Sequence, residues 1–343
     1  MRRLLPEDGG FVLSAIIDSS GSTPRGPGAL MLTGRNGRLW GSIGGAQAEY
    51  RCLENAKTLI AGRGGVSLQK FVMADAAPQS DGRYETDETN CDAVCGGWIL
   101  VFSQYLDSAA AGLPDLLEKG VECFSEKECT WLFMKIADNS SLCLAQAGGI
   151  RAYIGAQPVS AAALLTSAPA CREQDGGGWF SMPLTRAGLV YIFGGGHVAQ
   201  ELAPLLSRLE FRCVVFDDRD EFTRRELFPD AVGIIRGDFS RIEDSLALDE
   251  NDYALVVTRG HRWDFQVESF ALNSKAAYIG VIGSKRKHAF IEEQLRAHGF
   301  SAEQIHASRV HAPVGINIGS KTPAEVAVSI AAELISVRFR QTS

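Results

Sequence analysis

The sequence has no apolar stretch near the roughly 18 residues that a bilayer crossing needs, which argues against a transmembrane helix. The basic start at Met1–Arg3 is not followed by an apolar segment, so no signal peptide is predicted. Basic residues are not in excess either, because 34 Lys and Arg face 41 Asp and Glu and leave a formal net charge of −7. That balance argues against a nucleic-acid partner. These absences together predict a cytoplasmic protein with neither a membrane nor a nucleic acid as its partner.

Cysteine pairs of the CxxC type are also lacking. The eight cysteines are scattered, and without a secretion signal we expect reduced thiols rather than a disulfide framework; they are Cys52, Cys91, Cys95, Cys123, Cys129, Cys143, Cys171 and Cys213. Cys91 and Cys95 lack the usual zinc spacing and have no histidine nearby, so a structural zinc site is not predicted.

The length of 343 residues suits two domains better than one core. The pattern of elements changes near residue 186, from short strands with helical patches to a regular alternation of apolar strands and helices. We therefore expect an α/β protein with an N-terminal α+β domain over 1–185 and a C-terminal Rossmann-like domain over 186–343. Alternating strands and helices predict a doubly wound parallel sheet in the second domain.

In the first half, strands are predicted over 11–18, 29–34, 38–43, 97–102, 130–136 and 141–145. The second and third of these flank Asn36-Gly37, a strong hairpin signal. A helix is predicted over 46–61, where small and apolar residues recur at helical spacing. The glycine run at 175–178 is interpreted as a flexible turn near the linker.

In the second half, the predicted strands cover 189–193, 212–217, 231–235, 253–257 and 278–282, and the predicted helices cover 197–209, 263–274 and 285–298. The last helix has a clear start, because Thr322 can cap it, Pro323 suits the first position and Glu325 completes a capping box. Its apolar stripe leads us to predict a homodimer, although the same stripe could pack only on its own sheet; the stripe consists of Val326, Ile330, Leu334 and Val337.

The strongest chemical signal is a GxGxxA motif between a strand and a helix. Its turn is formed by Gly194, Gly195 and Gly196, and His197 opens the helix. Such glycines allow a tight turn and a close approach of the backbone to a phosphate at the helix N-terminus. Asp217 ends the next strand, 23 residues after Gly194, where an acid commonly holds a ribose hydroxyl. The motif predicts nucleotide or dinucleotide binding; the alternative is a turn kept for packing.

Two further loops follow strands of the same predicted sheet. Gly283, Ser284, Lys285 and Arg286 begin a helix and offer a second anion-binding loop; the alternative is a solvated basic turn. His261 follows the strand over 253–257 and could donate to a ligand or exchange protons near neutral pH. A surface histidine without a role is the competing interpretation.

The first half carries three loops with related features. The first holds Ser22, Thr23 and Arg25, and the second holds Gly44 and Gly45 ahead of a helix that bears Gln47 and Glu49. Both offer backbone N–H groups suited to a pterin or a phosphate, although each could be an ordinary glycine turn. In the third loop Cys95 precedes Gly96 and Gly97, which leave it uncovered, and a thiolate there could ligate a soft metal. A buried, inert thiol is the alternative.

Taken in order, these motifs resemble the XdhC and CoxI family, the xanthine dehydrogenase accessory factors. The resemblance covers nearly the whole chain and is carried by the segments at 21–25, 41–45, 95–97, 193–199, 217–219, 278–286, 311–315 and 322–325. It implies a protein that binds molybdenum cofactor, as molybdopterin or its cytosine dinucleotide form. Such proteins protect the cofactor during sulfuration and deliver it to a molybdenum hydroxylase such as xanthine dehydrogenase. It also implies a cysteine desulfurase as a partner. We expect the glycine loops to bind the cofactor, and we expect Cys95 to contact the metal or its sulfur ligands, because two glycines leave it uncovered and a thiolate is a soft ligand.

The chain departs from the family pattern in places. Ala46 stands where a third glycine is frequent, and Arg259 and Gly260 precede His261 where the family usually has a Thr-His-Asp or Thr-His-Asn run. The stretch from about 103 to 186 matches weakly.

Three functional hypotheses follow. The leading one is a cofactor-binding chaperone without catalysis of its own. The second is an NAD(P)-dependent oxidoreductase that uses the same Rossmann site, with His261 as a proton donor. The third is a sulfur-handling enzyme that uses Cys95.

Overall fold

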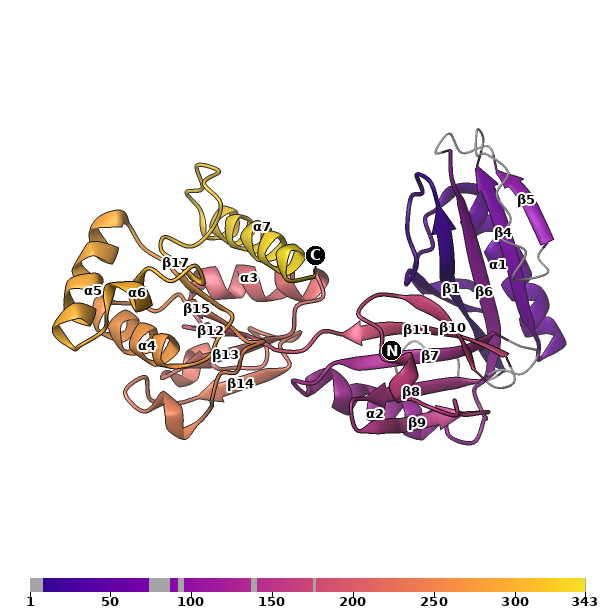
Figure 1. Ribbon diagram of the computed structural model, residues 1–343, viewed down its shortest axis with the longest axis horizontal. Helices are drawn as coiled ribbons and strands as arrows, with labels where there is room; N and C mark the ends of the chain where they lie inside the picture. The colour runs from indigo at the N-terminus through magenta and orange to yellow at the C-terminus, as the bar shows by residue number, and fades with distance from the viewer. Residues whose placement is uncertain (1–8, 74–86, 92–95, 137–140, 175–176, 343) are drawn as a thin grey trace. The chain divides into compact units, whose positions relative to one another are not determined.

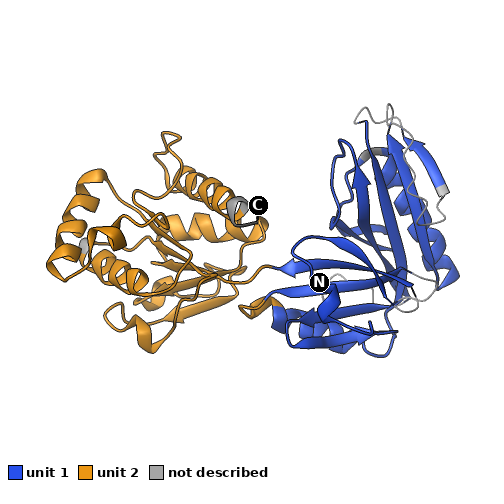
Figure 2. Cartoon of the chain, viewed as in Figure 1, with its two compact units in different colours: residues 1–123, 129–185 blue, residues 124–128, 186–343 orange. Residues whose placement is uncertain are grey.

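The computed structural model describes residues 9–73, 87–91, 96–136, 141–174 and 177–342. The chain divides into two compact units, shown in different colours in Figure 2. Unit 1 comprises residues 1–123 and 129–185, and unit 2 comprises residues 124–128 and 186–343. The second unit therefore includes a short segment that the sequence analysis assigned to the first domain.

Unit 1 contains a six-stranded sheet in the order β3-β2-β1-β6-β4-β5 (Figure 1). Its strands are β1 (Gly10–Ser20), β2 (Leu30–Gly34), β3 (Gly37–Gly41), β4 (Val66–Met73), β5 (Asp87–Cys91) and β6 (Trp98–Asp107). Helix α1 (Ala46–Gly62) packs on one face through small residues such as Ala48 and Cys52. The predicted helix and hairpin are confirmed, with the turn at Arg35-Asn36 because Gly37 already pairs with Gly34.

The second sheet of unit 1 has the order β10-β11-β7-β8-β9. Its elements are α2 (Leu113–Ser125), β7 (Thr130–Ile136), β8 (Leu142–Gln146), β9 (Gly149–Ile154), the short helix Ala162–Leu164, β10 (Ala170–Gln174) and β11 (Gly177–Thr185). Both sheets contribute to one core, in which Phe102 of β6 and Phe180 of β11 are buried. Gly177 and Gly178 begin β11, which pairs with β10 from Gln174 and Gly177 onward. The glycine run therefore lies between two strands of unit 1 and not at the boundary between the units; residues 175–176 lie outside the described residues.

Unit 2 is a doubly wound sheet in the order β14-β13-β12-β15-β16-β17, with every neighbouring pair parallel. Its strands are β12 (Val190–Phe193), β13 (Cys213–Asp217), β14 (Gly233–Arg236), β15 (Tyr253–Val256), β16 (Tyr278–Val281) and β17 (Val310–His311). The helices are α3 (His197–Arg208), α4 (His261–Asn273), α5 (Lys285–Ala297), α6 (Ala302–Ile305) and α7 (Pro323–Thr342), with short helices at Asp220–Phe222 and Ile242–Asp244. One apolar core lies under α4 and α5, and the other lies under α3 and α7. The predicted Rossmann-like α/β fold is confirmed.

The apolar stripe of α7 belongs to the second of these cores. Ile330 and Leu334 are fully buried, and Val326 and Val337 pack beside them against the residues of α3 and the sheet. The stripe is therefore used inside its own unit, and it does not offer the exposed surface that the homodimer prediction needed. The capping box is confirmed, because the Glu325 N–H donates to the Thr322 hydroxyl at 3.3 Å and the Thr322 N–H donates to the Glu325 carboxylate at 3.0 Å.

Segment 124–128 is fixed in unit 2 by buried charges. Lys127 donates to Asp252 at 2.6 Å, and the Asp252 side chain is fully buried. Arg212 is 4% exposed, and its guanidinium donates to carbonyl oxygens of this segment and of residues 186 and 188. Buried charges need partners, and residues 124–128 supply partners for the buried side chains of Asp252 and Arg212 in unit 2.

Candidate functional site

The carboxyl edge of the unit 2 sheet contains a topological switch point. Strand β12 lies between β13 and β15, so the chain leaves β12 in one direction and returns on its other side. Open parallel sheets bind their ligands at such a point, outside the carboxyl ends of the strands. The glycine turn at 194–196 follows β12 and lies at this position.

The three glycines of this turn differ in how much space a side chain would have. A Cβ on Gly194, whose φ is +111°, would lie 2.6 Å from the Val257 carbonyl oxygen. A Cβ on Gly195 would lie 2.3 Å from the Phe222 carbonyl oxygen, whereas a Cβ on Gly196 would meet nothing within 4 Å. Gly194 and Gly195 are therefore required by close packing of the turn, whereas a side chain at Gly196 would meet open space. Gly196 begins α3 without a side-chain cap, so that helix end is available to an anion.

Asp217 holds the turn in place. Its Oδ2 accepts from the Gly195 N–H at 2.8 Å and from Arg219 Nη2 at 3.0 Å, and its Oδ1 accepts from Arg219 N and Nε at 3.0 and 2.9 Å. Although burial opposes ionisation, these hydrogen bonds hold the pKa of Asp217 below its ordinary value. A carboxylate has about four acceptor positions, so none remains for a ribose hydroxyl. The structure thus uses Asp217 to position the turn.

The loop after β16 begins a helix at Lys285, as expected, and its anion binding stays a prediction. Ser284 caps α5, because its hydroxyl accepts from the Lys287 N–H at 3.2 Å. Lys285 and Arg286 are exposed at the helix start, as a solvated basic turn would be. Lys287 instead forms a 2.5 Å ion pair with Asp264, which is fully buried.

Asp264 connects two loops of the carboxyl edge. Its other oxygen accepts from the Thr258 hydroxyl at 2.8 Å, after β15, while Lys287 also donates to the Ile282 carbonyl at 3.2 Å, after β16. Nearby Glu268 is 4% exposed, and burial followed by repulsion from Asp264 raises its pKa to about 7. The sequence did not predict this network, because no local pattern indicates that residues 258, 264 and 287 contact one another. His261 is the first residue of α4, and its side chain lies outside the described part.

The three predicted loops of unit 1 come together in space. A Cβ on Gly21 would lie 2.9 Å from the Gly96 carbonyl oxygen, and one on Gly97 would lie 2.6 Å from the Ser22 carbonyl oxygen. A Cβ on Gly44 would lie 3.3 Å from Pro24. Residues far apart in sequence thus form one cluster, beside which Ser22 and Arg25 are exposed and Thr23 is half-buried.

Glu49 of α1 fixes the second of these loops. Its Oε2 accepts from the Ser42 hydroxyl at 2.5 Å and from the Gly45 N–H at 3.2 Å. Its Oε1 pairs with Arg38 at 2.8 Å. Gly45 itself has a φ of +73° and open space around its missing Cβ, as does Gly96 at +68°. Gly45 and Gly96 therefore leave half-buried backbone beside open space that a side chain would fill.

A narrow pocket of about 30 Å³ opens beside the first two of these loops, which is room for about one water molecule. Its lining includes Pro24, Gly44, Gly45, Met73 and Cys91. Cys91 is 4% exposed, and Cys95 lies outside the described residues. Burial raises the pKa of the Cys143 and Cys213 thiols to about 12, so these two are inert. Among the described residues, no group of three or more His, Cys, Asp or Glu could hold a metal ion.

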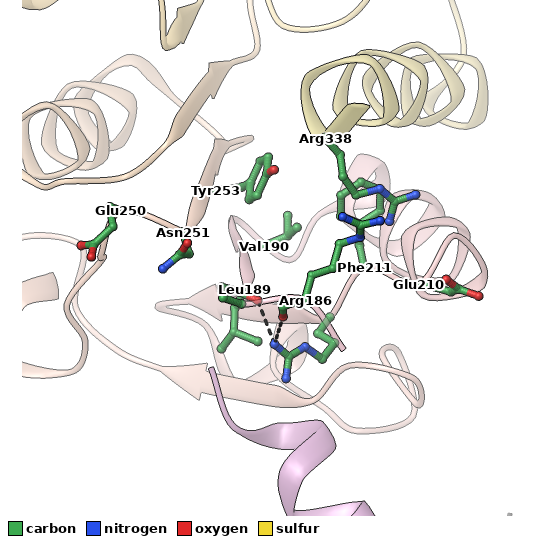
Figure 3. A pocket seen from close by; sticks show the side chains of 12 residues that line it. Arg186, Leu189, Val190, Glu210, Phe211, Glu250, Asn251, Tyr253 and Arg338 are labelled. Carbon is green, nitrogen blue, oxygen red and sulfur yellow. Dashed lines mark hydrogen bonds between the residues drawn. The ribbon is translucent and has the colours of Figure 1, made fainter. Parts of the chain in front are cut away.

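Unit 2 also has a cavity of about 370 Å³ at its opposite edge (Figure 3). It lies at the amino ends of β12 and β15, where Val190 and Tyr253 line it together with Phe211 and Arg338. Arg338 of α7 lies over the Phe211 ring at 4.1 Å and donates to the Leu209 carbonyl. Because ligands of parallel sheets bind at the carboxyl edge, we place the candidate site of unit 2 at the glycine turn.

The fold and the loops define a class of protein. Its members have an α+β unit and a Rossmann-type unit, and each unit has glycine-rich loops. Two family models then match the chain: the XdhC Rossmann domain over residues 190–334, and the XdhC and CoxI family over residues 4–71. The chain belongs to the XdhC and CoxI family.

Curated relatives agree with this assignment. The chain is 24% identical over 337 residues to a probable xanthine dehydrogenase subunit of Bacillus subtilis, covering 98% of this chain and 96% of the relative. It is 31% identical over 168 residues to the uncharacterized protein YqeB of Escherichia coli, covering 48% of this chain but only 30% of YqeB. It is 26% identical over 150 residues to the E. coli molybdenum cofactor insertion chaperone PaoD, covering 44% of this chain and 40% of PaoD.

A crystal structure of a xanthine dehydrogenase from Bacillus halodurans matches with a TM-score of 0.73 at 22% identity, over 99% of this chain and 94% of that one. At this identity the match supports the fold alone. Separately, none of the helices in the described ranges combines the length and hydropathy that a bilayer crossing needs.

Proposed function

We propose that this protein is an accessory factor of a molybdenum hydroxylase such as xanthine dehydrogenase. It binds molybdenum cofactor as its cargo, protects it during sulfuration and delivers it to the apo-enzyme. Membership of the XdhC and CoxI family and the likeness to PaoD support this role. A cysteine desulfurase that supplies the sulfur is the second proposed partner, and we propose a cytoplasmic location.

The convergence of the unit 1 loops carries the proposal. Segments 21–25, 44–45 and 96–97 meet. Gly45 and Gly96 are half-buried with open space at their missing Cβ atoms, and Arg25 of the same cluster is exposed. The N–H groups of Gly44 and Gly45 are already bonded to Ser42 and Glu49, so the exposed arginine is the group that suits the phosphate of a pterin cofactor. The described pocket holds only about 30 Å³, so a bound cofactor would lie on these loops and not inside the pocket. We propose that Cys95, next to Gly96, contacts the metal or its sulfur ligands.

The test is to purify the protein from a molybdenum-replete host and identify the bound small molecules by mass spectrometry. Recovery of molybdopterin or its cytosine dinucleotide, absent when the host cannot make the cofactor, is the expected result and also reveals which form is bound. Recovery of NAD(P)H without any pterin would contradict the proposal and favour the oxidoreductase hypothesis.

Variants locate the cargo. Arg25→Ala should lower the pterin content several-fold, whereas Arg35→Ala, which removes another exposed arginine of the same unit, should not. Cys95→Ser should reduce both pterin content and activation of the partner hydroxylase, with Cys171→Ser of β10 as the control. Full content and full activation with Cys95→Ser would remove the thiol from the site.

The homodimer remains a proposal with less support, since the α7 stripe is buried. Light scattering at micromolar concentration tests it, and a mass near 37 kDa would rule the dimer out.

A further inference from the structure

The cavity at the amino edge of the unit 2 sheet is large enough for a small molecule. Its volume of about 370 Å³ falls in the range of small-molecule sites, and every residue that lines it belongs to unit 2. Four of the lining side chains form an apolar wall, and none of them is more than 7% exposed; they are Leu189, Val190, Phe211 and Tyr253. The cavity therefore offers a ligand an apolar surface that includes two aromatic rings.

Two arginines reach this wall from different parts of the chain. Arg186 precedes β12, and Arg338 lies on α7. Figure 3 shows both side chains turned toward the same part of the cavity, beside Phe211. Arg338 lies over the Phe211 ring and donates to the Leu209 carbonyl oxygen at 2.9 Å. The Arg186 side chain is exposed, and within the described part of the chain its guanidinium has no hydrogen bond or ion pair, so it is available to a ligand.

The charges around the cavity favour an anion. Three arginines line it against two glutamates, because Arg212 is the third arginine and donates to backbone carbonyl oxygens behind the wall. Burial, followed by the charge of Arg186, lowers the pKa of Arg338, while Glu210 acts in the opposite direction. The guanidinium groups of Arg186 and Arg338 therefore repel each other. An anion between them would replace this repulsion with two attractive contacts.

We propose that this cavity binds a small aromatic carboxylate. The carboxylate accepts hydrogen bonds from Arg186 and Arg338, because the fork of a guanidinium matches two carboxylate oxygens. The aromatic body lies against Val190 and Tyr253 and removes their apolar surface from water. A small inorganic anion would leave that surface wet, and a neutral ring would leave the two arginines without a counter-charge, so the cavity selects a molecule with both features.

This site is separate from the loops assigned to the cofactor. It lies at the amino ends of β12 and β15, whereas cofactors of parallel sheets bind at the carboxyl ends. The inference therefore goes beyond the proposed function and does not depend on what unit 1 binds. Arg186 is also the residue at which the chain enters unit 2 after Thr185. A ligand that holds its side chain should slow amide exchange in residues 186–188.

Titration calorimetry on the full chain tests this with benzoate and 2-naphthoate, which carry both features. Three partial probes accompany them: benzyl alcohol has the ring without the charge, acetate has the carboxylate without the ring, and benzylamine carries the opposite charge. We expect at least one aromatic carboxylate to bind about tenfold more tightly than each partial probe, because each lacks one of the two sets of contacts. Amide exchange with and without that carboxylate then locates the site at residues 186–188.

Two matched variants separate the site from a general effect of charge. Arg186→Gln should weaken the aromatic carboxylate about tenfold and leave the thermal melt unchanged, because this guanidinium has no hydrogen bond or ion pair to lose. Arg208→Gln removes an exposed arginine of α3 that does not line the cavity, and it should leave the affinity unchanged.

Three results would overturn the proposal. Neither aromatic carboxylate binds with a Kd below about 10 mM, or a partial probe binds as tightly as both of them, or Arg186→Gln changes the affinity no more than Arg208→Gln does. Pterin content is measured separately, so this failure is distinguishable from failure of the proposed function.

Discussion

The two units hold their glycine loops by different means. In unit 2, buried charges fix the loops: Asp217 clamps the turn at 194–196, and Asp264 with Lys287 connects the loops after β15 and β16. In unit 1, close glycine contacts bring three distant segments together, and Glu49 is the carboxylate that fixes one of them. In a site at the edge of a parallel sheet, the strands fix the positions of the loops. In a site formed by loops that are distant in sequence, contacts between the loops fix their positions.

Among substitutions at these loops, Asp264→Ala should have the largest effect on the unfolding free energy. It leaves Lys287, only 16% exposed, without its ionic partner and removes the 2.8 Å acceptor of the Thr258 hydroxyl. We expect a loss of about 3–5 kcal/mol in the unfolding free energy. Amide exchange should show the loss in unit 2 and leave unit 1 protected. The matched control is Asp244→Ala, which removes an exposed pair with Arg241 and should change stability by less than about 1 kcal/mol. An equally small effect for Asp264→Ala would show that buried charge does not hold these loops.

The pH dependence of unit 2 should come next in size. The pKa of Glu268 is raised to about 7 in the folded chain, above its ordinary value of 4.5. The folded state therefore binds the extra proton between these two values, and this group makes stability fall as pH rises through that window. Glu268→Gln should remove a penalty of roughly 3 kcal/mol at pH 8 and little at pH 4. Melts of the two proteins across this range decide it, and parallel curves would contradict the expectation.

Within the turn, the glycines should differ in sensitivity. Gly195→Ala places a Cβ 2.3 Å from the Phe222 carbonyl oxygen and should destabilise unit 2 by about 1–3 kcal/mol. Gly196→Ser adds a favourable helix cap in open space and should stay within about 0.5 kcal/mol of the wild type. Gly196→Asp should also fold, yet abolish ligand binding at the turn, because its carboxylate repels a phosphate. Denaturant titration and calorimetry measure the two effects separately.

The smallest expected change lies in unit 1. Glu49→Gln weakens the hydrogen bonds to Ser42 and the Gly45 N–H and should reduce stability by about 1 kcal/mol. Faster amide exchange in residues 41–45 is the specific signature. Glu54→Gln on the same helix, which loses only an exposed pair with Lys57, should not produce it. Identical exchange in both variants would mean that the glycine contacts alone hold this loop.

Several features of the fold could be predicted because they depend on local sequence patterns. The hairpin at β2 and β3, helix α1, the βα alternation of unit 2 and the capping box at Thr322 all depend on residues within a few positions of each other. Such short-range rules are readable in a sequence. The motif at 194–199 belongs to the same group, because its turn is encoded by consecutive residues.

Long-range pairing was not readable in the same way. The stripe on α7 fitted an interface as well as a core until α3 and the sheet were seen to cover it. Segment 124–128 joins unit 2 only because Asp252 and Arg212 bind it there, more than 80 residues away in sequence.

The sequence by itself determined the Rossmann-like unit, the positions of the glycine loops and the family, since periodicity and motif spacing are local properties of the chain. Tertiary structure decided the roles: Asp217 holds the turn, Asp264 connects two loops of the sheet edge, and the loops of unit 1 meet. The physical reason is that a side chain's role depends on which donors and charges reach it in the folded chain, and those partners lie at sequence separations that no local pattern records.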